Sequence, residues 1–241
     1  MKSNVPNIIT CCNLICGCCA VVAALYGSAE VALLMIVLGA AFDFCDGLSA
    51  RALGVSSPIG KELDSLADCI TFGFAPSAMI FYELVVMPFP LQLSGLRDYV
   101  PYLAFIMAAF SALRLAKFNL DTRQTTSFIG LPTPANALFW GSLLVSCHQW
   151  FENIPYGFAF IIVMMLLSSW LLVCELPMFA LKFKHWGLHE PGNMVKYCFI
   201  AFSVVVFLAS FVGGMALASI AVIILAYILV SFIMWCISKH Q

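Results

Sequence analysis

Long apolar runs separated by short polar stretches make up most of the chain. The runs cover residues 8–25, 31–53, 66–86, 99–116, 134–147, 158–174, 197–212 and 215–237. Several of them reach the roughly 20 residues that an α-helix needs to cross a bilayer core. Their apolar positions are continuous rather than alternating, which excludes a β-barrel. The pattern therefore predicts an all-α, polytopic membrane helix bundle, with residues 1–241 forming a single integral membrane domain.

Composition strengthens this prediction. Hydrophobic residues make up 63% of the chain and charged residues 10%, whereas a soluble domain has about 25% charged residues. The net charge of −1 and the lack of a basic tract give no reason to expect a nucleic-acid partner. The cysteines fall inside apolar runs, without the Cys/His spacing of a zinc site, so we interpret them as small hydrophobic residues.

The basic residues predict how the helices are oriented. If successive runs alternate in direction, one set of connections holds almost all lysines and arginines, and the other holds only Arg97. The positive-inside rule then places both termini on the cytoplasmic side. We expect a protein of the cell (inner) membrane. The longest polar connection, residues 182–193, is interpreted as a solvated cytoplasmic turn.

Four aspartates interrupt the apolar pattern where the second and third runs approach each other. Asp43 and Asp46 are three residues apart, and Asp64 and Asp68 are four residues apart. Both spacings put the two side chains of a pair on one helix face. Pro58 suits the first position of a new helix. The sequence therefore predicts an antiparallel helix hairpin whose two carboxylate pairs face each other.

Carboxylates at a membrane margin lose hydration and repel one another, so a functional role is the default interpretation. Either protonation or bound cations would relieve the repulsion, and oxygen-only ligands suit Mg²⁺, Ca²⁺ or Mn²⁺. Four carboxylates can hold two ions, an arrangement that serves phosphoryl displacement. A solvated acidic loop does not fit the flanking apolar residues. A divalent-cation transporter is an alternative, and it would place carboxylates near mid-membrane in discontinuous helices.

The aspartates belong to a longer motif, Asp-x-x-Asp-Gly-x-x-Ala-Arg, eight residues, then Gly-x-x-x-Asp-x-x-x-Asp. Its fixed positions are Asp43, Asp46, Gly47, Ala50, Arg51, Gly60, Asp64 and Asp68. In this motif the chain resembles the CDP-alcohol phosphotransferases. The resemblance implies a six-helix core plus two further transmembrane helices, a homodimer, and a cytoplasmic site for Mg²⁺ or Mn²⁺ with two ions. It also implies transfer of a phospho-alcohol from a CDP-linked donor, with release of CMP.

Three further stretches, within residues 6–14, 114–119 and 128–134, resemble family members that use L-serine as acceptor. The resemblance covers about residues 6–137, and it implies that CDP-diacylglycerol and L-serine give phosphatidylserine and CMP. It also implies that Asp68 acts as the catalytic base. Glycerol phosphate, inositol phosphate, an amino alcohol or an archaeal lipid substrate stay open as alternatives. We expect residues 1–137 to form the catalytic half and residues 138–241 the C-terminal transmembrane helices.

Candidate site residues follow from these stretches. The candidate metal ligands are Asp43, Asp46, Asp64 and Asp68. The candidate donor-binding residues are Asn7, Thr10, Asn13, Asp43, Asp46, Gly47, Ala50, Arg51, Ser57 and Gly60. The candidate acceptor-binding residues are Arg114, Lys117 and Asn119. Arg114 and Lys117 share a helix face, where they could bind the serine carboxylate or the donor phosphate, or simply anchor the helix at the membrane surface. The loop 128–134 could close over the acceptor.

Overall fold

The computed structural model describes residues 4–55, 57–121, 128–179 and 193–239. The elements are α1 (Asn4–Leu25), α2 (Ala29–Leu53), α3 (Pro58–Asp68), the π-helix η1 (Cys69–Phe74), α4 (Ala75–Val86), the 3₁₀ helices η2 (Leu91–Leu96) and η3 (Val100–Ala104), α5 (Phe105–Leu120), β1 (Phe128–Ile129), α6 (Thr133–Asn153), α7 (Gly157–Val173), β2 (Pro177–Met178), α8 (Asn193–Val212) and α9 (Ala216–Lys239). The polar connection expected at 182–193 lies outside the described residues, except for Asn193 at the start of α8.

The helices confirm the predicted polytopic membrane fold. Among the described residues, six helical segments are long and apolar enough to cross a membrane: α1, α2, α3–α4, η3–α5, α8 and α9. The remaining two predicted runs correspond to α6, with 21 residues, and to α7, a shorter apolar helix of 17 residues. The fifth run was predicted to end at residue 147, but α6 continues to Asn153. Residues 148–153 mix polar and aromatic side chains, so hydropathy does not mark them as part of the helix.

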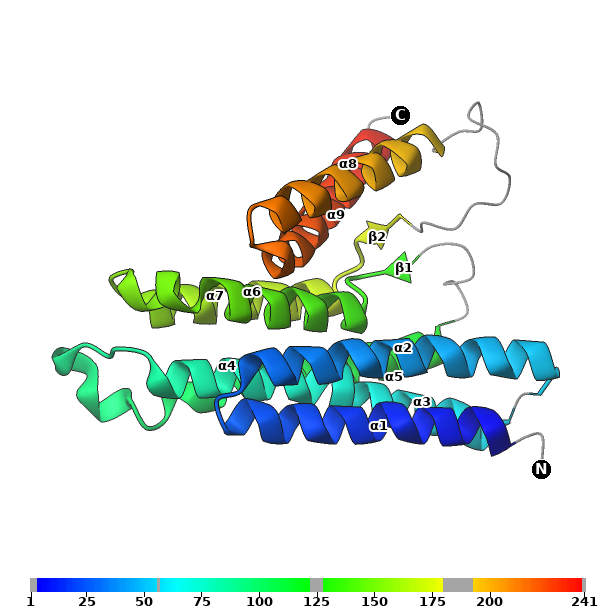
Figure 1. Cartoon of the computed structure of the whole chain (residues 1–241), viewed down its shortest axis with the longest axis horizontal. Helices are drawn as coiled ribbons and strands as arrows, with labels where there is room; N and C mark the ends of the chain where they lie inside the picture. The colour runs from blue at the N-terminus through cyan, green and yellow to red at the C-terminus, as the bar shows by residue number, and fades with distance from the viewer. Residues whose placement is uncertain (1–3, 56, 122–127, 180–192, 240–241) are drawn as a thin grey trace.

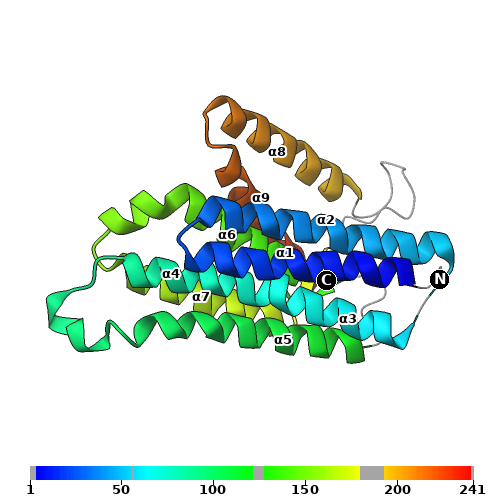
Figure 2. The same cartoon turned by 60° about the horizontal axis from the view of Figure 1, so that its bottom comes forward.

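Helices α1 to α5 lie lengthwise beside one another, and α6 and α7 lie alongside them (Figure 1). The view turned by 60° shows the same long bundle, with the α8–α9 hairpin crossing over it (Figure 2). Helix α9 makes the contacts of this hairpin with α6 and β2. Helix α1 begins, and α2 ends, at the end of the bundle where the motif aspartates lie, so the α1–α2 turn marks the opposite end (Figure 1).

Small residues let α1, α2 and η1 approach closely next to the aspartates. A Cβ atom added to Gly17 would lie 2.9 Å from the backbone N and Cα of Thr71, and one added to Gly39 would lie 2.6 Å from the Thr71 methyl carbon. The Thr71 hydroxyl donates a hydrogen bond to the carbonyl of Asn13 at 3.1 Å. Close helix contacts through glycine are typical of membrane bundles. Here they fix the segment that directly follows Asp68.

The stretch 128–134, which was predicted as a loop, contains the exception to the all-α pattern. Strand β1 pairs antiparallel with β2, so that Phe128 lies opposite Met178. Gly130 adopts a positive φ of 76°, and its N–H donates to the carbonyl of Leu176 at 2.9 Å. The next residue, Leu131, is fully buried. The stretch is therefore fastened to the end of α7 by backbone hydrogen bonds.

We predict that Gly17→Val lowers the midpoint of thermal unfolding in detergent by several degrees. The new side chain would meet the Thr71 backbone, which cannot move aside as a side chain can. Overpacking of this kind costs about 1–3 kcal/mol, more than the gain in helix propensity on replacing a glycine, which is under about 1 kcal/mol. Gly213→Val is the matched control, because the nearest atom to its added Cβ is 3.5 Å away. Equal midpoints for the two variants would contradict the proposed packing.

Candidate active site

Two helix ends form the hairpin that carries the aspartates. Helix α2 stops at Gly54, whose φ of 63° is left-handed and whose N–H donates to the Arg51 carbonyl at 3.2 Å. Helix α3 restarts at Pro58, and the Ser57 hydroxyl caps it by accepting the Gly60 N–H at 3.0 Å. Glycine past a helix end, and serine followed by proline at a helix start, are the expected signals. The predicted stop and restart are confirmed.

Three of the four aspartates converge. One carboxylate oxygen from each of Asp43, Asp64 and Asp68 lies within 4.8 Å of the other two. All three side chains are partly buried, and Asp64 Oδ1 is a buried atom with no hydrogen-bond partner in the described part of the chain. A buried carboxylate oxygen normally has a partner, and like charges this close need a counter-charge. The donor set therefore fits a hard divalent cation.

The fourth aspartate is held separately. Asp46 is buried, at 7% exposure, and its Oδ2 accepts a hydrogen bond of 2.6 Å from the Thr10 hydroxyl on α1. It is not part of the group of three, although it lines a neighbouring cavity together with Asp64. Thr10, which was predicted to contact the donor, therefore also fixes one of the predicted metal ligands.

The neighbouring cavity has a volume of about 270 Å³ and lies between the start of α1, the end of α2 and the start of α3. Its lining includes most of the predicted donor-binding residues, namely Asn7, Thr10, Asp46, Gly47, Ala50, Ser57 and Gly60. Arg51 is exposed, and its guanidinium lies 3.6 Å from where a Cβ of Gly47 would be. Lys61 also lines the cavity and was missed, although its place directly after Gly60 was a usable signal.

Asn13 was predicted to contact the donor, but it lies next to Asp68. It is fully buried, and its Nδ2 donates to Asp68 Oδ1 at 3.2 Å instead of lining the donor cavity. Its own Oδ1 is buried without a hydrogen-bond partner among the described residues. Asn13 therefore orients the carboxylate of Asp68.

Arg114 and Lys117 meet at a second, small cavity of about 50 Å³ near the end of α5. Arg114 is buried, at 7% exposure, and its Nη1 donates to the Thr133 hydroxyl at 3.2 Å. Its Nε is buried without a partner in the described residues, and its charge interacts with that of Asp68. Thr133 was missed as a site residue, although it lies in the stretch 128–134 that pointed to the acceptor. The arrangement leaves a buried donor available to an anionic group.

Asn119 does not join these two residues. Its Nδ2 donates to the Ser65 hydroxyl at 2.7 Å, and its carbonyl accepts a hydrogen bond of 3.0 Å from the Lys61 ammonium. Both contacts tie the end of α5 to α3. Asn119 therefore helps to position Lys61 and does not lie beside Arg114 in the small cavity.

Comparison with known proteins identifies the family. The family model for CDP-alcohol phosphatidyltransferase matches residues 3–183. The chain belongs to this family. The range that the family model matches includes six long helical segments, α1, α2, α3–α4, α5, α6 and α7, and α8 and α9 begin after it. This confirms the predicted core with two further helices.

Several relatives within the family bear the name CDP-diacylglycerol–serine O-phosphatidyltransferase. The protein of that name from Bacillus subtilis is 34% identical over 190 residues, which cover 79% of this chain and 95% of the relative. The one from Mycobacterium leprae is 30% identical over 180 residues, 72% of this chain and 57% of the relative. The one from Saccharomyces cerevisiae is 34% identical over 140 residues, 51% of this chain and 45% of the relative.

We predict that Asp64→Asn weakens Mn²⁺ binding at least tenfold, as measured by isothermal titration of the purified protein. Loss of an outer-shell partner already weakens metal affinity by about 10–100-fold, and Asp64 supplies a buried oxygen inside the cluster. Asp98→Asn removes an exposed aspartate from the opposite end of the bundle and serves as the control. Equal Mn²⁺ affinity in the two variants would show that the cluster is not the metal site.

Proposed function

We propose that this protein transfers the phosphatidyl group of CDP-diacylglycerol to the hydroxyl of L-serine, giving phosphatidylserine and CMP. The observation that carries the proposal is the buried guanidinium of Arg114, which lies near Asp68 and opens on a small cavity, and whose Nε has no hydrogen-bond partner among the described residues. Such a site suits a small acceptor that carries a carboxylate. The names of the relatives favour the same acceptor.

The metal ions we propose are Mg²⁺ or Mn²⁺. The cluster of Asp43, Asp64 and Asp68 offers only oxygen ligands, which these hard ions prefer. With Asp46 held alongside by Thr10, four carboxylates are available, enough for two ions. Bound there, such ions would neutralise negative charge on the donor pyrophosphate and on the CMP that leaves.

The chain's own residues bring the reactants together. Asp68 takes the proton from the serine hydroxyl, because a hydroxyl needs a base within about 3 Å to attack at neutral pH. The serine oxygen then forms a bond to the phosphorus that carries diacylglycerol, and the bond from that phosphorus to the CMP oxygen breaks. Asn13 holds the Asp68 carboxylate in a fixed orientation by donating a hydrogen bond to its Oδ1.

The cytidine diphosphate part of the donor occupies the 270 Å³ cavity. Gly47 and Ala50 leave room for close approach, and the ammonium of Lys61 and the guanidinium of Arg51 can contact phosphate oxygens. The diacyl tails stay in the bilayer between helices. Because Asp46 and Asp64 line this cavity, the pyrophosphate reaches the carboxylate cluster directly.

Several wider features belong to the same proposal. The site and both termini face the cytoplasm of the cell (inner) membrane, because one set of connections holds most of the lysines and arginines. The family resemblance favours a homodimer. The metal-binding, donor-binding and acceptor-binding side chains that we propose all lie within residues 1–137.

Asp68→Asn should reduce CMP release by about 10²–10⁴-fold, the usual contribution of a general base. The amide keeps the shape of the side chain and can no longer take a proton, so binding of CDP-diacylglycerol should stay measurable. Turnover is followed as CMP released by purified protein in mixed micelles, with Asp98→Asn as the control. Substantial turnover by Asp68→Asn would rule out its role as the base.

Arg114→Gln should raise the KM for serine by about 10–100-fold, because hydrogen bonds to charged groups contribute about 1.5–3 kcal/mol. The KM for CDP-diacylglycerol should change little, since Arg114 lies outside the donor cavity. CMP release is measured with serine, glycerol 3-phosphate and inositol phosphate supplied separately, and Arg97→Gln, an exposed arginine at the other end, is the control. Release of CMP with one of the other acceptors but not with serine would overturn the acceptor assignment and leave the family chemistry intact.

A further inference from the structure

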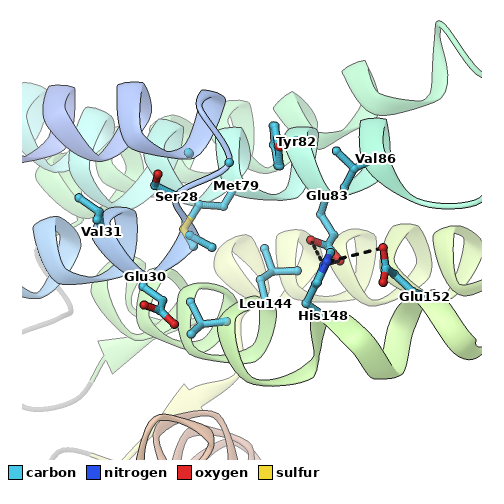
Figure 3. A pocket seen from close by; sticks show the side chains of 14 residues that line it. Ser28, Glu30, Val31, Met79, Tyr82, Glu83, Val86, Leu144, His148 and Glu152 are labelled. Atoms are coloured by element: carbon cyan, nitrogen blue, oxygen red, sulfur yellow. Dashed lines mark hydrogen bonds and ion pairs between the residues drawn. The ribbon is translucent and has the colours of Figure 1, made fainter.

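A larger cavity lies at the end of the bundle opposite the aspartates. It has a volume of about 530 Å³ and is enclosed by the α1–α2 turn, the second half of α4 and the last turns of α6 (Figure 3). Its lining includes Glu30, Glu83, His148 and Glu152. The reaction proposed above uses none of these residues.

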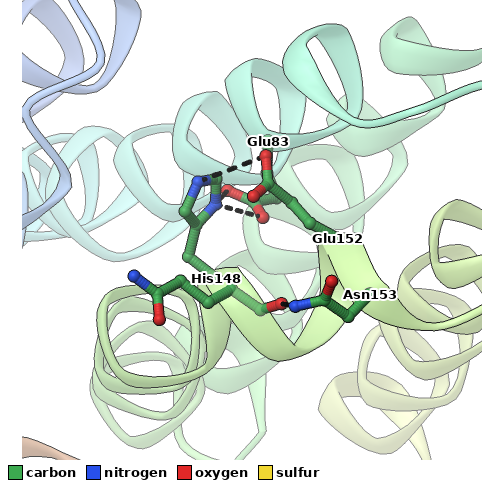
Figure 4. A network of polar contacts seen from close by, with 5 residues as sticks. Glu83, His148, Glu152 and Asn153 are labelled. Atoms are coloured by element: carbon green, nitrogen blue, oxygen red, sulfur yellow. Dashed lines mark hydrogen bonds and ion pairs between the residues drawn. The ribbon is translucent and has the colours of Figure 1, made fainter.

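The imidazole of His148 is held in a defined orientation. Its Nδ1 lies 2.8 Å and 3.0 Å from the two carboxylate oxygens of Glu83, a buried residue of α4 that is 6% exposed (Figure 4). A carboxylate at this distance accepts the Nδ1–H, so Nε2 is the nitrogen left for another partner. Histidines that bind metals commonly have their second nitrogen fixed by a carboxylate in this way.

The other ring nitrogen faces a second carboxylate one helical turn away. His148 Nε2 lies 3.6 Å from Glu152 Oε1 on the same helix. This distance is too long for a hydrogen bond, although it is within the range of an ion pair when the imidazole is protonated. It matches two atoms that bind one Zn²⁺ ion, because bonds of about 2.0–2.2 Å at a tetrahedral angle separate the donor atoms by about 3.3–3.6 Å.

Charge and space also favour a cation. The described residues that line the cavity include no lysine or arginine, whereas three glutamates are present. Both His148 and Glu152 are partly open to the cavity, with side-chain exposures of 42% and 39%. Water can therefore complete the coordination. A donor pair of one nitrogen and one oxygen suits a borderline ion such as Zn²⁺ better than Mg²⁺.

We propose that His148 and Glu152 bind a divalent transition-metal ion of the Zn²⁺ class, with Glu83 orienting the histidine from α4. The two ligands come from α6 and the orienting carboxylate from α4, so an ion at this site strengthens the contact between these helices. The site is distinct from the aspartate cluster in both position and donor chemistry, and it does not depend on which acceptor the enzyme uses.

Zn²⁺ binding to the 241-residue protein in detergent tests the proposal. Mg²⁺ in excess occupies the aspartate cluster, and alkylation blocks the free cysteines, which would otherwise bind Zn²⁺. Equilibrium dialysis against Zn²⁺ then counts bound ions, and thermal unfolding measures stabilisation. We expect the unaltered protein to bind one more Zn²⁺ than His148→Ala, and only the unaltered protein to unfold at a higher temperature when Zn²⁺ is added.

The remaining variants separate a residue that binds the ion, Glu152, from a residue that orients a ligand, Glu83. Glu152→Gln should weaken Zn²⁺ binding at least tenfold, and Glu83→Gln should weaken it by about 10–100-fold, as expected for a residue that acts through the ligand. Asn153→Ala is the matched control, because Asn153 is exposed on the same helix and its Nδ2 donates only to the carbonyl of Gln149 among the described contacts. This variant should bind Zn²⁺ normally.

Three results would overturn the site. One is normal Zn²⁺ binding by both His148→Ala and Glu152→Gln. Another is loss of the extra ion in Asp64→Asn alone, which would assign it to the aspartate cluster. The third is stabilisation by ethanolamine or spermidine without any response to Zn²⁺, which would make the cavity a site for organic ammonium ions. If Glu83→Gln unfolds, Glu152→Gln decides the question, because Glu152 is on the surface.

Discussion

Three carboxylates that meet inside an apolar helix bundle determine which polar groups must surround them. Asp43, Asp64 and Asp68 repel one another and have little water to stabilise their charge. The surrounding polar groups point positive or hydrogen-bearing atoms toward this region: Asn13 donates to Asp68, and the Arg114 guanidinium lies close enough for its charge to act on Asp68. These groups reduce the electrostatic cost without cancelling it. A divalent cation in the cluster would neutralise the remaining negative charge of the carboxylates.

Such a cluster works only if the backbone around it is held at fixed positions, since metal ligands tolerate little movement. The close contact of Gly17 and Gly39 with Thr71 brings three helical segments together directly beside Asp68. The π-helix η1 begins at the residue after Asp68. The wider turn of η1 changes the helical register after Asp68. Asp68 can therefore face the other aspartates while Thr71 faces Gly17 and Gly39. Interruptions of this type are frequent at functional sites.

The sequence was enough to predict the membrane helices and the aspartate hairpin, because hydropathy and helical spacing are local signals. Side-chain contacts between distant segments carry no such signal. Thr10 and Asn13 were both expected at the donor. Thr10 does line the proposed donor cavity, but it also holds Asp46, whereas Asn13 lies outside the cavity lining and holds Asp68. Asn119 follows Arg114 and Lys117 in the chain, but the helix turns its amide toward Ser65. Spacing along the sequence indicated which polar residues lie near the site. Only the packing of the helices determines the hydrogen-bond partner of each one.

The small cavity beside Arg114 is lined by residues from both sides of position 137. One wall of this cavity is made by residues 172–175, at the end of α7 and directly after it, and the β1–β2 pairing anchors the chain just before Thr133. Further along, the Tyr227 hydroxyl of α9 donates a hydrogen bond of 3.0 Å to the Phe179 carbonyl next to β2. The proposed binding side chains all come from the first 137 residues, and so does Thr133, which holds Arg114, but part of the cavity wall comes from α7 and the residues after it. The C-terminal part of the chain therefore shapes the proposed acceptor site, even though it supplies none of the proposed binding groups.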